Sequence, residues 1–106
     1  MKNSKSKILS QIKRIVKDRE PSAQIYLYGS RSRGTDTQES DWDLLILLDK
    51  DNVSSEDERE ITYPLYDLEF DTGEVISPMV YSEKEWKSKY RVTPFYKNVM
   101  EEGILL

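Results

Sequence analysis

Two short groups of residues carry the side chains best suited to chemistry. Gly29-Ser30 follows the strand-like segment 24–28, and Asp41 and Asp43 stand where a second strand-like segment begins. Residues two apart in a strand project from the same face, so both carboxylates point to one side of the sheet. Two carboxylates aimed at one point repel each other unless a cation lies between them. The pair therefore predicts a divalent metal site.

The loop that begins at Gly29-Ser30 suits phosphate binding. A glycine lets phosphate oxygens approach backbone N–H groups where a Cβ would obstruct them, and the Ser30 hydroxyl adds a hydrogen-bonding group. Arg31 and Arg33 place positive charge in the same loop. A metal on the carboxylates would bridge a triphosphate and polarise the attacked phosphorus, while the loop donors would hold the leaving pyrophosphate.

The composition supports a metal site built from oxygen ligands. The 106 residues include no cysteine and no histidine. This excludes a disulfide framework, a thiolate zinc site, a cysteine nucleophile and a histidine general base. The ligands that remain favour Mg²⁺, Mn²⁺ or Ca²⁺.

Charge is distributed unevenly along the chain. Residues 1–35 contain nine basic and two acidic side chains, whereas residues 36–85 contain three basic and sixteen acidic ones. Solvated helix faces alone account for such a pattern, although it also suits phosphate binding beside carboxylate ligands. The scattered lysines and the net charge of -4 argue against nucleic acid binding. No long apolar segment is present, so we expect no membrane association and a cytoplasmic location.

Hydrophobic periodicity predicts the elements that must position these residues. Helices are predicted over four segments: 4–18, 56–71, 83–90 and 94–102. Strands are predicted over three segments: 24–28, 42–48 and 75–81. We therefore expect one domain over residues 1–106, of the α+β class. Its small mixed sheet of three to four strands is expected to pack with helices on one side.

Residues 61–71 allow two interpretations. Apolar residues at helical spacing continue the helix that Ser55-x-x-Glu58 opens as a capping box. The same residues also alternate between apolar and acidic side chains, as a strand does, and Pro64 weakens an unbroken helix. We favour the helix, in which Asp67 and Glu69 face solvent. If residues 66–70 instead form a strand, either Asp67 or Glu69 could supply a third carboxylate to the pair.

The spacing of the motif resembles that of a known family. The sequence resembles the motif of the minimal nucleotidyltransferases of the DNA polymerase β-like superfamily. Here the motif consists of Tyr28-Gly29-Ser30, ten further residues, and Asp41-Trp42-Asp43-Leu44. The extended loop Gly29-Ser30-Arg31-x-Arg33-Gly34 matches the small bacterial members. The resemblance implies a polymerase β-like nucleotidyltransferase fold. It also implies that the loop contacts the phosphates of an NTP, ATP above all, and that the two aspartates ligate Mg²⁺ or Mn²⁺.

The family uses a third carboxylate on a later strand, and here the sequence departs from its pattern. Ile76–Val80 aligns best with that strand, and Ser77 or Pro78 stands where the acid is expected. A serine cannot act as a base at neutral pH. Asp67 and Glu69 remain the weaker candidates for the missing group.

The resemblance implies transfer of a nucleoside monophosphate, AMP from ATP, to a hydroxyl on a partner protein. Small family members act as antitoxins of HEPN-type toxins, so such a helical protein is the expected partner and acceptor. A second hypothesis is a nucleotide-binding module that restrains its partner by contact alone. Ser77 favours this alternative, whereas the intact Gly29-Ser30 and aspartate pair oppose it. The sequence does not determine the oligomeric state.

Overall fold

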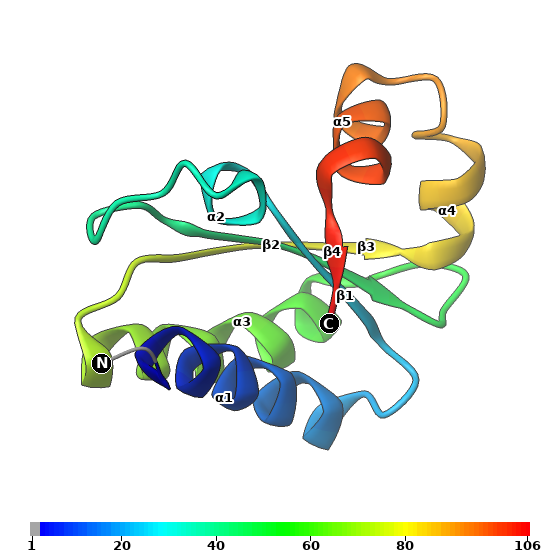
Figure 1. The fold of residues 1–106 in the computed structure, drawn as a ribbon. Helices are drawn as coiled ribbons and strands as arrows, with labels where there is room; N and C mark the ends of the chain where they lie inside the picture. The colour runs from blue at the N-terminus through cyan, green and yellow to red at the C-terminus, as the bar shows by residue number, and fades with distance from the viewer. Residues whose placement is uncertain (1–2) are drawn as a thin grey trace.

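The computed structural model describes residues 3–106, with side chains from Lys5 onward. Five helices and four strands follow one another in the order α1 (Asn3–Arg19), β1 (Gln24–Tyr28), α2 (Ser30–Arg33), β2 (Trp42–Leu48), α3 (Ser55–Thr72), β3 (Ile76–Ser82), α4 (Glu83–Ser88), α5 (Pro94–Glu102) and β4 (Ile104–Leu105). Figure 1 shows the sheet lying between α1 and α3 below it and α4 and α5 above it.

The four strands form one mixed sheet in the order β3-β2-β1-β4. β1 is antiparallel to both β2 and β4, whereas β2 and β3 are parallel and are joined through α3. A parallel pair needs a long crossover connection, which this helix supplies. The expected α+β class with a small mixed sheet is confirmed. Pro78 lies in the edge strand β3, where a missing backbone N–H disturbs the ladder least.

The two long helices cover the lower face of the sheet. Alternate residues of β2, Leu44, Ile46 and Leu48, point to this face and are fully buried. They belong to the same apolar cluster as Ile12 of α1 and Leu65 of α3. An apolar stripe on each helix therefore packs on the apolar face of the strand, as the periodicities of 3.6 and 2 predict. None of the helices within residues 3–106 is long and apolar enough to span a membrane.

The short helices α4 and α5 cover part of the upper face. Leu45 and Leu47 of β2 are buried there with Trp86 of α4 and Val99 of α5, and tyrosine and phenylalanine side chains surround this second cluster. The expectation of helices on one side therefore holds for the long helices only. The continuous apolar run of β2 over Leu44–Leu48 places buried side chains on both faces of the sheet, and α4 and α5 form the second layer that this run requires.

The predicted elements are largely confirmed, and the differences have local causes. β1, β2 and α5 have the expected bounds, and residues 55–72 form the helix that we favoured, with Pro64 inside it. The capping box uses Ser54 and Asp57 rather than Ser55 and Glu58, so the prediction was wrong by one residue. The single-turn helix α2 and the two-residue strand β4 were not predicted, because neither is long enough to produce a periodic pattern.

Candidate active site

Asp41 directly precedes β2 and Asp43 is its second residue, and both side chains lie on the upper face of the sheet. Trp42 between them is buried toward the lower face, whereas Asp43 is half-buried and Asp41 is exposed. Asp43 is paired with Tyr28 of β1 on one side and with Ser77 of β3 on the other. Three strands therefore meet at Asp43, and side chains of all three share its face.

Gly29 brings the phosphate-binding loop against the Asp43 carboxylate. Its backbone has φ +79° and ψ -158°, a conformation that favours glycine. A Cβ added to Gly29 would collide with Oδ2 of Asp43 and would lie 3.2 Å from Cγ. The Gly29 carbonyl accepts hydrogen bonds from the backbone N–H groups of Ser32 and Arg33, which closes the turn of α2. The predicted loop and the predicted carboxylate are thus in direct contact.

Replacing Gly29 with alanine is expected to damage both the fold and the site. The positive φ and the collision with Asp43 each cost free energy, so we expect unfolding to become easier by about 1–3 kcal/mol. We also expect binding of ATP with Mg²⁺ to weaken, because the carboxylate must move away. Thermal denaturation and calorimetric titration measure the two effects. Gly34→Ala is the matched control, since Gly34 also has a positive φ, of 76°, but a methyl group there would meet no atom within 4 Å.

Ser77 occupies the position where a third carboxylate was expected. Its register partner is Asp43, and its hydroxyl donates a hydrogen bond to Oδ2 of Asp41 over 3.3 Å. Within residues 3–106, no three acidic side chains come close enough together to hold a metal ion. The side chain that joins the carboxylate pair on β3 is therefore a hydroxyl group. The strand register pairs Asp43 with Ser77 and Leu44 with Pro78, so Ser77 is the residue at the position of the missing acid.

The two weaker candidates for a third carboxylate lie elsewhere. Asp67 and Glu69 are in α3, which covers the opposite face of the sheet (Figure 1). Asp67 is exposed, and Oε2 of Glu69 accepts a hydrogen bond of 2.8 Å from the backbone N–H of Ile76. Glu69 thus holds the end of α3 to the start of β3. Neither acid joins the pair, because the helical conformation directs them away from it.

The charges around Asp43 make the pair receptive to a cation. Burial raises the pKa of Asp43, the charge of Asp41 raises it further, and Arg33 opposes both effects. Burial and the neighbouring Asp43 also raise the pKa of Tyr28 to about 12, so this phenol stays protonated at neutral pH. Two carboxylates that are short of compensating charge suit Mg²⁺, which is commonly held by one or two carboxylates together with substrate phosphates.

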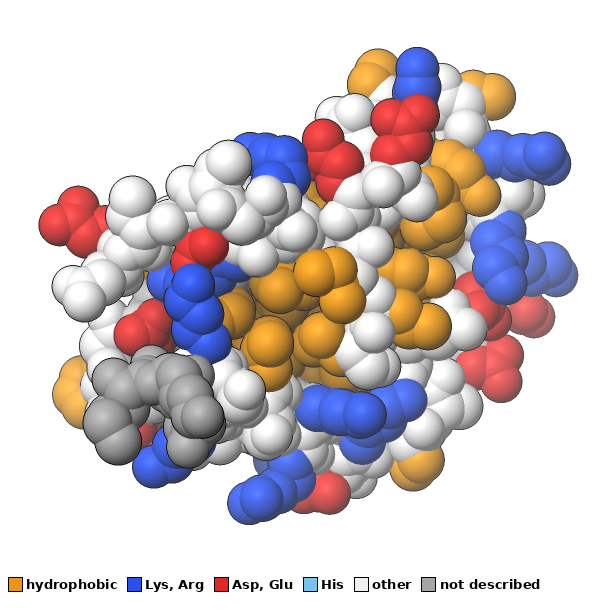
Figure 2. All heavy atoms as spheres, in the orientation of Figure 1, with side chains coloured by type: hydrophobic (Ala, Val, Ile, Leu, Met, Phe, Trp, Pro, Cys, Tyr) orange, Lys and Arg blue, Asp and Glu red, His pale blue; other side chains and the backbone are white. Residues whose placement is uncertain are grey.

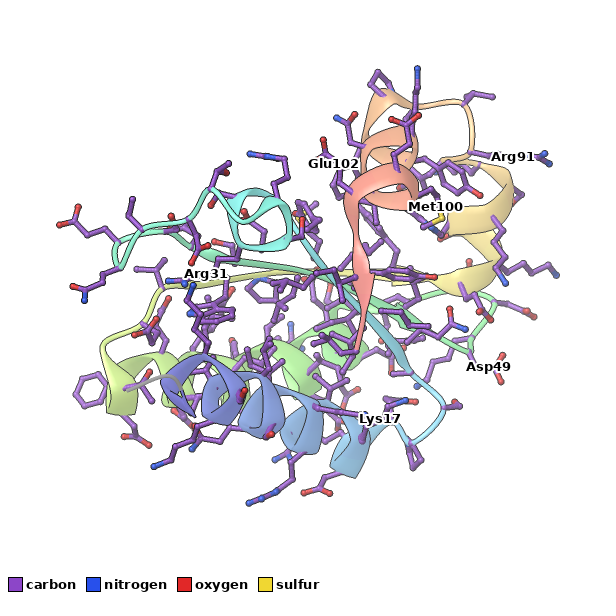
Figure 3. All side chains as sticks on the ribbon, in the orientation of Figure 1. Lys17, Arg31, Asp49, Arg91, Met100 and Glu102 are labelled. Carbon is purple, nitrogen blue, oxygen red and sulfur yellow. The ribbon has the colours of Figure 1, made fainter. Side chains whose placement is uncertain are left out.

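Arg31 is turned away from the carboxylate pair. Its side chain is only 5% exposed and pairs with Asp36, with 2.9 Å between Nη1 and Oδ2. The same guanidinium donates two hydrogen bonds to the Ser40 carbonyl and lies 3.9 Å over the Trp42 ring. Figure 3 shows this side chain reaching from α2 toward α1. The structure therefore places Arg31 as an anchor for the loop over residues 30–40, and not beside the predicted phosphate position.

Arg33 remains on the side of the carboxylates. Its side chain is 47% exposed and forms an ion pair with Glu102 at the end of α5, with 3.1 Å between Nη1 and Oε2. Figure 3 shows Glu102 projecting from α5 toward the loop. No sequence pattern pointed to Glu102, because the two residues are 69 positions apart and no local spacing links them. Arg33 is thus the arginine that remains near the proposed phosphate site.

Exchanging each arginine for methionine should separate the two roles. Arg31→Met is expected to lower the free energy of unfolding by about 1–3 kcal/mol, because it leaves buried oxygen acceptors without their donor. Arg33→Met is expected to leave stability nearly unchanged and to weaken ATP–Mg²⁺ binding several-fold. Chemical denaturation and calorimetric titration report the two quantities. If both variants lost the same amount of affinity for ATP–Mg²⁺ and Arg31→Met kept its stability, the assignment of Arg31 as an anchor would be wrong.

The fold and its motif can be compared with known proteins. Residues 9–106 match the family model described as a nucleotidyltransferase domain. A crystal structure of a toxin–antitoxin with AMP-PNP is 23% identical, with a TM-score of 0.64 over 91% of this chain and 69% of the other. A mutant of the toxin–antitoxin MntA-HpeT is 23% identical, with a TM-score of 0.60 over 92% and 70%. No curated protein matches the sequence. Because the family model spans nearly the whole chain, this protein belongs to the nucleotidyltransferase domain family.

Proposed function

We propose that the protein is a Mg²⁺-dependent nucleotidyltransferase that moves AMP from ATP to a hydroxyl group on a partner protein. The observation that supports this most directly is the contact between Gly29 and the Asp43 carboxylate, with Asp41 on the same face. A loop suited to phosphate and a carboxylate pair suited to a cation thus meet at one point. Membership of the nucleotidyltransferase family supports the reaction class.

Each side chain of the site has a distinct role in this proposal. Asp41 and Asp43 would hold the metal, which when bound neutralises phosphate charge and polarises the attacked phosphorus. Gly29 and Ser30 would hold phosphate oxygens, and Arg33 would compensate charge on the leaving pyrophosphate. We do not assign a phosphate contact to Arg31, because its guanidinium is engaged with Asp36 and Ser40.

The transfer itself requires one bond to form and one to break. The acceptor hydroxyl oxygen attacks the α-phosphorus of ATP, the bond from that phosphorus to the bridging oxygen breaks, and pyrophosphate leaves. The hydroxyl proton must go to a base. The Ser77 hydroxyl cannot accept it at neutral pH, so the proton passes to solvent or to a group of the acceptor protein. We therefore expect a slower enzyme than one with a carboxylate at this position.

The acceptor is proposed to be a toxin protein of the HEPN type. The matched structures are toxin–antitoxin proteins, one of them with AMP-PNP. Asp41 is exposed, so the upper face of the sheet is accessible to a hydroxyl group carried by another chain. An acceptor that supplies both its own hydroxyl and a base fits a site whose third acidic position holds Ser77.

The proposal is tested by mixing the protein with the product of a neighbouring gene, Mg²⁺ and ATP labelled on the α-phosphate. We expect label on the partner and release of pyrophosphate, both lost when EDTA is added. ATP labelled on the γ-phosphate is the matched control and should leave no label on the partner. Label from γ-labelled ATP would indicate a kinase instead and would contradict the proposal.

Restraint of a partner by contact alone is the second candidate, and Ser77 favours it. In that case the carboxylate pair and the loop bind ATP–Mg²⁺ without transferring AMP. The same assay distinguishes the two: a stable complex with the partner, retained nucleotide binding and no label on the partner would support the non-catalytic function.

A further inference from the structure

The outward face of α3 carries a row of exposed aromatic side chains. Tyr63, Tyr66 and Phe70 are three and four residues apart, so they lie on one side of the helix. Phe70 is 90% exposed, Tyr63 is 59% exposed and Tyr66 is 44% exposed. Single exposed hydrophobic residues are ordinary, but three aromatic rings in one row form the kind of surface that marks an interface.

The two helices on the lower face of the sheet, α1 and α3, carry opposite charges. α3 contains seven acidic side chains and one basic side chain, whereas α1 beside it contains six basic side chains and one acidic side chain. Glu60 and Asp67 of α3 are exposed next to the aromatic row, and Lys7 and Arg14 of α1 are exposed as well. Figure 2 shows Lys and Arg side chains along the lower edge of the molecule, where α1 lies in Figure 1.

We propose that this face binds a second copy of the chain, with α1 of each protomer lying on α3 of the other. Figure 1 shows α1 and α3 side by side and running in opposite directions. A two-fold axis parallel to the helices, in the plane of the interface, places each basic helix over the partner's acidic helix. The face is therefore complementary to itself, as a two-fold dimer requires. A two-fold axis across the helices would instead place like charges together.

The spacing of the charged residues agrees with this arrangement. Lys7 and Arg14 are seven residues apart, as are Glu60 and Asp67, and seven residues advance a helix by about 10.5 Å. Two ion pairs of equal spacing can thus form in each half of the interface. Such exposed pairs contribute little affinity but select the orientation, while the aromatic row supplies buried apolar area. The stems of Lys and Arg side chains would cover these rings, with cation–π attraction.

The size of the face indicates a weak dimer that leaves the active sites free. Helices of this length, about 25 Å, and a combined width of about 20 Å give roughly 500 Å² per protomer, below the roughly 800 Å² of a standard interface. We therefore expect dissociation in the micromolar range. The carboxylate pair lies on the opposite face of the sheet, so each protomer keeps its site exposed.

Sedimentation velocity over a range of micromolar concentrations tests the dimer. We expect a concentration-dependent dimer for the full chain, weakened by high salt. Phe70→Ser with Tyr66→Ser should weaken association at least tenfold, because the apolar contact is removed. Circular dichroism verifies that the variants remain folded, which is expected because neither side chain belongs to the core.

A reciprocal charge reversal identifies the contacting helices. One variant carries Lys7→Glu and Arg14→Glu, and the other carries Glu60→Lys and Asp67→Lys. Each alone should be monomeric, because like charges then meet in both halves of the interface. An equimolar mixture should restore a dimer, because each reversed helix meets a helix of opposite charge. A wild-type protein that stays monomeric, or a mixture that does not pair, would overturn the proposal.

Discussion

Asp43→Asn is expected to lower AMP transfer roughly 10²–10³-fold while leaving the protein folded. Asp43 lies at the junction of three strands and directly against Gly29, so its carboxylate is the charge that the metal and the phosphates would share. Asparagine keeps the shape of the side chain and removes its charge. The transfer rate from α-labelled ATP to the partner protein measures the loss.

Asp43→Asn should lower transfer but should not lower the stability of the metal-free protein. The pKa of Asp43 is raised in the folded state, first by burial and then by Asp41, so its ionisation costs stability at neutral pH. This cost is absent below the unfolded pKa and develops as the pH rises through the raised folded pKa. In the presence of EDTA at pH 7, Asp43→Asn should therefore melt at the same temperature as the wild type or higher.

Asp67→Asn is the matched control for this experiment. It makes the same chemical change on the exposed face of α3, on the other side of the sheet. Transfer should remain within about twofold of the wild type, because surface substitutions away from the site rarely have large effects. If the Asp43 and Asp67 variants lost activity equally, the carboxylate pair would not be the site of transfer.

Ser77→Asp is expected to raise the transfer rate by roughly 10²-fold, within the usual range for an added general base. Ser77 is the register partner of Asp43 and its hydroxyl contacts Asp41, so an aspartate at this position would add a third carboxylate to the pair. Without metal, the added negative charge should lower the melting temperature. With Mg²⁺, the increase in melting temperature should exceed that of the wild type.

Ser77→Asn separates the effect of charge from that of size. It has nearly the volume of the aspartate and no charge, so it should not accelerate transfer or increase the response to Mg²⁺. A large gain in transfer from an inactive wild type would favour the non-catalytic function for the natural protein. If Ser77→Asp leaves an active wild type no faster, the proton already has an effective route to solvent or to a group of the acceptor protein.

Local sequence patterns predicted most of the elements correctly because each depends on neighbouring residues. The run of Leu44–Leu48 required cover on both faces, and those residues are buried by the two helix layers. The side chains of Ser82 and Thr93 cap α4 and α5 by accepting hydrogen bonds from backbone N–H groups three residues further along the chain. Residues 61–71 were ambiguous because two periodicities coincide there, and packing of Ile61 and Leu65 against the sheet accompanies the helix.

The candidate site residues could also be proposed from the sequence, but the residues that contact them could not. The alternation of a strand placed Asp41 and Asp43 on one face, and the glycine preceding Ser30 indicated close approach of the backbone. Which of the two arginines remains near that site depends on contacts with Trp42, Asp36 and Glu102, all of which lie outside α2. No spacing rule connects residues that meet only in the folded chain.

By itself, the sequence determined which residues are candidates for the site and which family their spacing resembles. Without His or Cys, its candidate metal ligands are oxygen atoms, and ten residues separate a Gly-Ser pair from an Asp-x-Asp pair. The tertiary structure alone decided that Ser77 completes the pair and that Arg31 serves as an anchor. The physical reason is that strand register and side-chain packing join residues far apart in the chain, whereas periodicity reports only on residues within a few positions of one another.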